Sequence, residues 1–302
     1  MRRAAKIALL VLLLLPVLAA GAGKLLGPGV FHPQLRELTA ALVAQADRAF
    51  STLGATREDF SVRAPDGILL RGWKVRPKNP NANWVLLFHG VSDNRAGMLG
   101  HAQFLLHAGY SVVMMDARAH GASEGTMATY GWKERYDTRA IVDALEKTET
   151  VGHLYALGES MGAAIAVQSA GIDPRIQKVA AESAFRNLRE VTYDYAGLRW
   201  SVLLGKTLFR PAAIMAIHEA EKEGGFRFDD VSPEKAVESR AFPILLICGL
   251  RDHNIPARHS EAIFRAAAGR KQLWLVPGAG HAGALGTAPE EFERRVLAFY
   301  GN

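Results

Sequence analysis

The amino-acid sequence predicts an α/β fold built on a doubly wound, mainly parallel sheet. Short apolar runs of strand length alternate with stretches of helix length over most of the chain. The chain has 302 residues, a length that one such sheet can accommodate as a single domain. Its apolar fraction of 49% and charged fraction of 22% are typical of a globular protein.

The first residues, 1–23, are expected to be a signal peptide or an N-terminal membrane anchor. Arg2, Arg3 and Lys6 form a basic start, residues 7–18 form an apolar segment, and small residues follow at 20–22. The uncharged stretch is at the lower limit for a membrane-spanning helix, so cleavage and retention both remain open. In either case we expect the folded part to be extracytoplasmic, that is, secreted, periplasmic or anchored to the membrane.

The remaining elements follow in order. An N-terminal helical extension over residues 24–59 contains a helix near 35–50, and two alternating segments around Pro65-Asp66-Gly67 predict a hairpin over 60–75. Apolar runs predict strands at 84–88, 111–115, 153–157, 177–181, 243–248 and 272–276. Helices are predicted at 98–108, 137–148, 163–170 and 260–268, with a last helix capped by Thr287 and started by Pro289.

The alternation stops between residues 184 and 240, where the sequence is aromatic and helical without a strand. An insertion of this length between two consecutive strands predicts a helical lid, placed before the penultimate strand and over the carboxyl edge of the sheet. Its aromatic residues either line an apolar acyl pocket or form the lid's own small core, and both readings stay open. They are Trp200, Phe209, Phe226 and Phe228.

Two general classes of site are disfavoured by composition. The net charge of +6 owes half to Arg2, Arg3 and Lys6, and the other basic residues are scattered among acids, so no nucleic-acid surface is expected. The single cysteine, Cys248, excludes an internal disulfide and a Cys-rich metal site. Because it lies in an apolar run, we expect a buried structural thiol.

The pattern Gly-x-Ser-x-Gly occurs twice, at residues 121–125 and 158–162. A nucleophilic serine in this pattern needs a strand before it and a helix after it, because the turn between them exposes the hydroxyl. Only Ser160 has that context, whereas Ser123 lies in a predicted loop. We therefore predict Ser160 as the nucleophile and Ser123 as a turn residue at the rim of the site.

The backbone around Ser160 also predicts an oxyanion hole. The amide of Met161 begins the helix after the nucleophile and faces the site. A second donor is expected from the loop after the strand at 84–88, where Val91 is the candidate. His89, beside it, is expected to hold that loop in shape and not to act as the base.

The acid and the base are expected at the ends of the last two strands. Asp252 follows the strand at 243–248 and His281 follows the strand at 272–276. His281 would accept the Ser160 proton, and Asp252 would orient the imidazole. His253 and His259 remain rivals for the base, and Glu182 is a rival for the acid. The sequence contains no zinc-binding His pair on one helix, phosphate loop or dinucleotide motif, so no metal or cofactor is expected.

Five motifs occur in a fixed order: His89-Gly90, residues 116–125, residues 158–162, residues 249–252 and Gly280-His281. From about residue 60 to the end, this order resembles the α/β-hydrolase superfamily. The similarity is greatest to the branch containing monoacylglycerol lipases, serine aminopeptidases and exported or membrane-anchored bacterial hydrolases. The resemblance implies a hydrolase domain over residues 60–302, with the lid at 184–240, and cofactor-free cleavage of esters, thioesters or amides.

These features predict a serine hydrolase that cleaves carboxylic esters of small or medium acyl groups through an acyl-enzyme. The alternatives are an exopeptidase or amidase on the same triad, or a catalytically silent binding protein of the same fold. An exopeptidase needs an acidic group to hold the substrate amine, for which Glu159, Glu182 or Asp229-Asp230 are candidates. The expected partner is a small-molecule ester or amide, with membrane association through the N-terminus left open.

Overall fold

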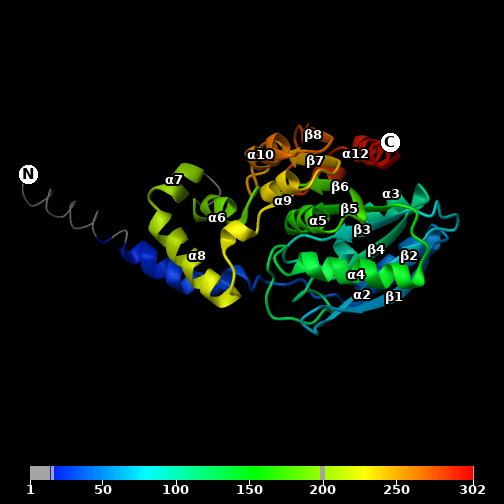
Figure 1. Cartoon of the computed structure of the whole chain (residues 1–302), viewed down its shortest axis with the longest axis horizontal. Coiled ribbons are helices and arrows are strands. Elements are labelled where there is room, and N and C mark those ends of the chain that lie inside the picture. Colours follow the sequence, from blue (N-terminus) through cyan, green and yellow to red (C-terminus); the bar gives the residue numbers. More distant parts are fainter. Residues whose placement is uncertain (1–13, 15–16, 198–200, 302) are drawn as a thin grey trace, which may run out of the picture.

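The computed structural model describes residues 14, 17–197 and 201–301, and it contains one eight-stranded sheet (Figure 1). The strands lie in the order β1-β2-β4-β3-β5-β6-β7-β8. The pairs β1–β2 and β2–β4 are antiparallel, and every other neighbouring pair is parallel. The predicted doubly wound, mainly parallel sheet is therefore confirmed. The strands are β1 (Thr56–Arg63), β2 (Leu69–Arg76), β3 (Trp84–Phe88), β4 (Ser111–Met115), β5 (Leu154–Glu159), β6 (Ile176–Glu182), β7 (Ile244–Gly249) and β8 (Lys271–Val276).

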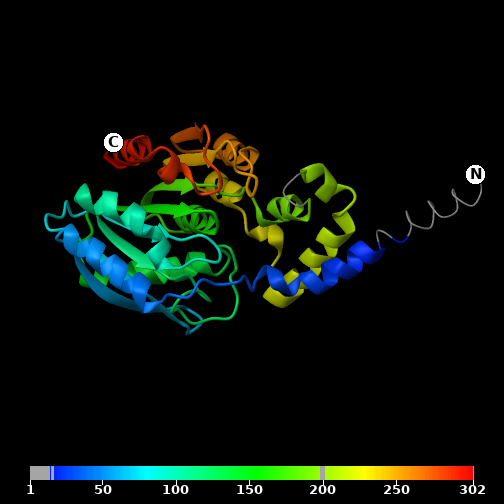
Figure 2. The ribbon, with the colours of Figure 1, turned by 180° about the vertical axis from the view of Figure 1, so that it is seen from behind.

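The central strands are apolar on both faces because helices cover both sides of the sheet. Along β3, Leu86 and Phe88 enter one hydrophobic cluster, while Val85 and Leu87 enter the other. The helices over the first face are α4 (Glu134–Thr148), α5 (Met161–Ile172), α9 (Pro233–Ser239) and α10 (Arg258–Ala266), and Figure 1 shows α4 and α5 in front. Figure 2 shows the other face, covered by η2 (Arg95–Met98), α2 (Ala40–Thr52), α3 (Leu99–His107), α11 (Ala284–Thr287) and α12 (Pro289–Gly301).

A separate lobe lies beyond the carboxyl end of the sheet, and we call it the cap lobe. It consists of residues 17–31, α6 (Leu188–Ala196), α7 (Val202–Lys206), α8 (Arg210–Gly224) and residues 226–231, which join the same hydrophobic cluster (Figures 1 and 2). Residues 17–26 are helical and lead into η1 (Pro28–Val30), which packs against α8. The short helix η3 (Phe228–Asp230) packs against α6.

The cap lobe corrects the expected lid at two points. Helix α9 lies within residues 184–240, but it packs against α5 and α10 and so belongs to the helical layer of the sheet. Conversely, residues 17–30 lie with α6–α8, far from them in the sequence. Gly23 and Gly27 make this contact possible, because an added Cβ would lie 2.1 Å from the Ala212 carbonyl oxygen and 2.9 Å from that of Ala216, respectively.

Two predicted boundaries and one predicted cap also change. Helix α2 begins at Ala40, five residues after the predicted start, because the Thr39 hydroxyl caps it by accepting a hydrogen bond from Leu42 N at 3.3 Å. Strand β1 begins at Thr56, inside the expected extension 24–59. Helix α12 does start at Pro289, but Thr287 is the last residue of α11 and does not cap it.

Most of the predicted leader, including Arg2, Arg3 and Lys6, lies outside the described residues, as does Trp200. Among the helices that the structure does describe, none combines the length and apolar character needed to cross a bilayer.

Candidate active site

Ser160 lies in the tight turn between β5 and α5. Its backbone adopts φ 54° and ψ −118°, a conformation that is strained for a residue with a side chain. The flanking glycines are required sterically. A Cβ on Gly158 would lie 2.4 Å from the Gly162 carbonyl, and a Cβ on Gly162 would lie 2.1 Å from the Phe88 carbonyl oxygen. The second Gly-x-Ser-x-Gly copy therefore forms the strand-turn-helix expected from the sequence.

His281 lies between Ser160 and Asp252. Its Nε2 is 2.9 Å from Ser160 Oγ, and its Nδ1 is 2.9 Å from Asp252 Oδ2. With Nδ1 protonated, the imidazole donates to the carboxylate and accepts from the serine hydroxyl. Ser160 and Asp252 are buried, while the His281 side chain is 22% exposed. The three residues predicted from strand ends thus meet in one hydrogen-bonded chain.

Asp252 is held as a carboxylate. Its Oδ1 accepts hydrogen bonds from Asn254 N at 2.9 Å and Ile255 N at 2.8 Å. Burial opposes ionisation, but the hydrogen bond and charge of His281, together with the Ile255 amide, outweigh it and lower the pKa of Asp252. An ionised acceptor beside Nδ1 is what an imidazole needs if it is to take up a proton at Nε2.

The loop that carries His281 is fixed to the end of β6. The Ser183 hydroxyl accepts a hydrogen bond from Ala282 N at 3.2 Å, and Glu182 Oε1 accepts one from Ala284 N at 2.8 Å. Glu182 was a rival for the acid, but its hydrogen bond goes to this loop, and Asp252 is the carboxylate bonded to His281. Burial raises the pKa of Glu182 to about 7.

The expected oxyanion donors lie beside the nucleophile. Met161 is the first residue of α5, so its amide has no acceptor within the helix. Val91 follows β3 and lines the same cavity as Ser160 and Met161. This arrangement can hold a developing negative charge next to Ser160 Oγ.

The other candidates from the sequence lie in structural contacts. His89 Nε2 accepts from Ala117 N at 3.0 Å, so its Nδ1 is the donor to the Gly90 carbonyl at 2.8 Å. Burial, followed by the charge of His120, lowers the pKa of His89 to about 4. Ser123 Oγ donates to the Asp116 carbonyl at 2.8 Å and accepts from Arg71 N at 2.9 Å. Both residues therefore shape the loops around the site.

The histidine rivals for the base also lie elsewhere. His259 is buried, with Nε2 2.8 Å from Asp194 Oδ2 and Nδ1 accepting from Arg186 N at 3.2 Å. His253 is exposed on the loop after Asp252. Cys248 is buried in β7, and burial, with the charge of Asp252 adding to it, raises the pKa of its thiol to about 12. It is the inert structural thiol expected from the sequence.

An apolar cavity of about 250 Å³ adjoins Ser160, and no charged side chain lines it within the described part of the chain. Phe226 and Phe228 do not reach this cavity. They pack with Phe31 at centroid distances of 5.3 and 5.9 Å and form the core of the cap lobe. Phe209 lines a second cavity, described below. The cavity at Ser160 is lined by Gly29, Val30, Pro33, Val91, Tyr130, Ser160, Met161, Phe185, Leu188, Val191, Thr192, Tyr195 and Ile255.

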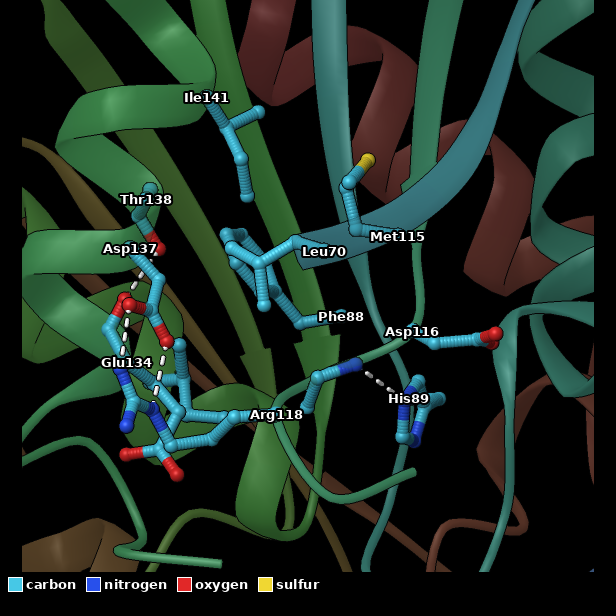
Figure 3. Close-up of a pocket in the computed structure, with 12 residues that line it drawn as sticks. Leu70, Phe88, His89, Met115, Asp116, Arg118, Glu134, Asp137, Thr138 and Ile141 are labelled. Atoms are coloured by element: carbon cyan, nitrogen blue, oxygen red, sulfur yellow. Dashed lines mark hydrogen bonds and ion pairs between the residues drawn. The ribbon is translucent and has the colours of Figure 1, made fainter. Parts of the chain in front are cut away.

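Another cavity, shown in Figure 3, lies under the loop after β4. Arg118 binds Asp137 there through Nε at 2.7 Å and Nη2 at 2.6 Å, and the His89 ring accepts the Ala117 amide. The cavity volume is about 20 Å³, which is about the space of one water molecule. This cavity is therefore too small for a substrate and forms part of the scaffold of the rim loop.

A buried polar cluster behind the nucleophile was not anticipated. His101, Glu159 and Glu182 each bring one potential ligand atom to within 4.8 Å of the others. Burial, together with the neighbouring carboxylates, raises the pKa of Glu159 to about 8, and burial lowers the pKa of His101 to about 4. Burial thus favours the protonated form of both carboxyls, whereas a cation site needs them ionised; the neutral imidazole alone is in the form that binds a metal. The only sequence signal was an acidic residue at the end of each of two apolar strands.

Comparison with known proteins finds hydrolases that are similar to this chain. The family model for serine aminopeptidase, S33, matches residues 79–221. A structure of the esterase Pf2001 from Pyrococcus furiosus superposes with a TM-score of 0.68 at 25% identity, covering 83% of this chain and 92% of that one. The chain belongs to the α/β-hydrolase superfamily. The predicted hydrolase fold is therefore confirmed.

Further similarities agree with this α/β-hydrolase assignment. Est1E from Butyrivibrio proteoclasticus, solved with ferulic acid, matches with a TM-score of 0.63 at 19% identity over 80% of this chain and all of that one. YqkD from Bacillus subtilis is 27% identical over 80% of this chain and 79% of its own length. Rv2307c from Mycobacterium tuberculosis is 29% identical over 82% of this chain and 79% of its own length. Both of these relatives are described as uncharacterized proteins.

Proposed function

We propose that this α/β hydrolase is a serine esterase that cleaves carboxylic esters through an acyl-enzyme on Ser160. The observation that carries the proposal is the hydrogen-bonded chain from Ser160 Oγ through His281 to Asp252, with both distances at 2.9 Å. Resemblance to esterase structures supports the same reaction class.

Each residue then has a defined part in the reaction. Ser160 Oγ attacks the carbonyl carbon of the ester while His281 Nε2 takes up the hydroxyl proton. The amides of Met161 and Val91 donate to the resulting oxyanion. The C–O bond to the alcohol breaks as His281 returns the proton to the leaving oxygen. A water molecule, deprotonated by His281, then attacks the acyl-enzyme and releases the acid and free Ser160.

The cavity favours an ester over an aminoacyl substrate. An aminopeptidase must hold a charged amine, yet no carboxylate is among the described residues that line the cavity at Ser160. Asp229 pairs with Arg189 at 2.8 Å, and burial raises the pKa values of Glu159 and Glu182. An apolar cavity free of charge suits an acyl chain.

The proposal predicts that Ser160→Ala lowers kcat/KM for a p-nitrophenyl ester by about 10³-fold or more, because the nucleophile is lost. Labelling by a fluorophosphonate should disappear in the same variant. Ser123→Ala is the matched control, since this serine lies in the other Gly-x-Ser-x-Gly copy and binds only the rim loop and β2. Equal loss of activity in the two folded variants, or a wild-type protein that neither labels nor cleaves, would overturn the proposal.

A further inference from the structure

The cap lobe contains a second and larger cavity next to the one at Ser160. Its volume is about 540 Å³, and it lies between the N-terminal helical residues, α6 and α8. Val30, Thr192 and Tyr195 line both cavities, so at most one layer of side chains separates them. The two cavities are therefore adjacent, with the side chains of Thr192 and Tyr195 on the boundary between them.

The second cavity is lined almost wholly by carbon. No charged side chain lines it in the described part of the chain, and the hydroxyls of Thr192 and Tyr195 are its only side-chain polar groups. Leu18, Ala22 and Leu26 form the wall contributed by the N-terminal helix. Such a cavity gains free energy by taking up apolar groups and offers no partner for a charged or strongly polar ligand.

The wall formed by the N-terminal segment is held firmly in place. Phe31 is fully buried among the aromatic residues of the cap lobe. The Val30 carbonyl accepts a hydrogen bond from Tyr130 Oη at 2.8 Å, and Ala128 N donates to the Phe31 carbonyl at 3.0 Å. These contacts fix the C-terminal end of this segment to the rim of the active site.

The outer surface of the lobe is apolar as well. Most of the large apolar side chains that are exposed in the described part of the chain lie in the cap lobe, within residues 17–26 and between Tyr195 and Ile214. Val17 is 66% exposed, Leu25 84% and Leu203 66%. Apolar surface concentrated in this way is typical of a site that contacts a membrane, another protein or an apolar ligand.

We propose that the second cavity binds the distal part of a long acyl chain whose ester carbonyl lies at Ser160. The inference rests on the proposed function and extends it: the substrates are esters of long-chain fatty acids, and the N-terminal helix is part of their binding site. This substrate class differs from the small or medium acyl groups expected from the sequence. The cavity at Ser160 holds the carbons nearest the carbonyl, and the cavity in the cap lobe holds the rest.

The test measures kcat/KM for p-nitrophenyl acetate, butyrate, octanoate, dodecanoate and palmitate. For the wild-type chain, kcat/KM should rise from butyrate to dodecanoate by up to roughly fourfold per methylene buried. Ala196→Trp fills only the second cavity, from α6, and should lower kcat/KM for dodecanoate by about tenfold or more while leaving butyrate nearly unchanged. Ala19→Trp should do the same from the opposite wall, so the result does not depend on one variant folding.

His218→Trp is the control for added bulk, because His218 is exposed on α8 and lines neither cavity. A second arm measures binding of the fluorescent fatty acid cis-parinaric acid to Ser160→Ala, alone and combined with Ala196→Trp. Loss of binding on filling the cavity supports the inference. Unchanged binding together with an unchanged chain-length profile overturns it. If no ester is cleaved at all, the proposed function fails, and the fatty-acid binding alone decides the inference.

Discussion

At the scale of single residues, Glu159, which precedes the nucleophile, has a carboxyl group with a raised pKa. Burial is the main cause that raises the pKa of Glu159 from 4.5 to about 8, and the charge of Glu182 adds to it. In the folded chain this carboxyl therefore keeps a proton that the unfolded chain releases above about pH 4.5. The contribution of Glu159 to the free energy of unfolding should consequently fall as the pH rises from about 5 to about 8.

Glu159→Gln removes this titration while keeping the shape of the side chain. We expect the difference in unfolding free energy between about pH 5 and about pH 8.5 to shrink by about 2 kcal/mol, after allowing for partial solvent screening. Urea unfolding at the two pH values measures this difference. Glu37→Gln, which removes an exposed carboxyl, is the matched control. A pH dependence identical to that of the wild-type chain would contradict the prediction.

At the scale of elements, Arg118 connects the loop after β4 to two other parts of the fold. It binds Asp137 on α4 in a bidentate pair and Asp66 in the β1–β2 turn at 2.9 Å. Arg118 and Asp137 are both buried. Burial raises the pKa of Asp137 to about 6 even beside this guanidinium. The ionised form of Asp137 is therefore stabilised by its pairing with Arg118.

Arg118→Met should therefore cost about 3 kcal/mol of unfolding free energy, because it leaves a buried carboxylate unpaired. Adding Asp137→Asn should restore part of the loss, which a double-mutant cycle by urea unfolding would measure. Arg294→Met breaks the exposed pair with Glu291 and should leave the midpoint nearly unchanged. Equal destabilisation by Arg118→Met and Arg294→Met would show that burial of the pair does not matter.

The same scale shows what could be predicted from sequence. The bounds of β3 and β4 match the apolar runs at 84–88 and 111–115, because polar residues end each run and helices bury both faces. Helix α4 begins at Glu134, three residues before the predicted start. The Glu134 carboxylate accepts hydrogen bonds from Thr129 N at 2.7 Å and Gly131 N at 2.8 Å. That anchor is a loop contact, which helical periodicity does not reveal.

The candidate site was predictable where strand ends define it and not where distant elements meet. Ser160, Asp252 and His281 each follow an apolar strand, and the carboxyl ends of parallel strands share one edge of the sheet. His101 lies on α3 and Glu182 lies at the end of β6, far from it in the sequence. No local sequence pattern therefore predicts that their side chains come together. For the same reason, the contact of Gly23 with Ala212, nearly two hundred residues away, could not be read from the apolar N-terminal pattern.

At the scale of the whole molecule, Phe31 joins the cap lobe to the rim of the sheet. It is 0% exposed, and its carbonyl accepts the Ala128 amide. Phe31→Ala should cost about 3–5 kcal/mol of local stability, because it leaves a cavity among Phe226, Phe228 and their neighbours. The loss should be confined to the cap lobe, since the clusters on the two faces of the sheet do not contain this residue.

Hydrogen exchange followed by mass spectrometry checks this prediction. Amides of α8 should exchange faster in Phe31→Ala, whereas those of β3 and β4 should keep the wild-type rate. Leu35→Ala, at a residue that is 47% exposed in the same segment, is the control. A uniform increase over the whole chain would mean that the cap lobe and the sheet unfold together.

The burial of Phe31 has a practical consequence for anyone who produces this protein. The segment before α2 reads as a leader that can be exchanged for another leader or for a purification tag. Val30 and Pro33 nevertheless line the cavity at Ser160, and the residues before them line the cavity in the cap lobe. A recombinant version that starts at α2 would lack part of the lining of both cavities. The N-terminal segment and the hydrolase are therefore not interchangeable modules, and a truncated version is not a faithful proxy for the full chain.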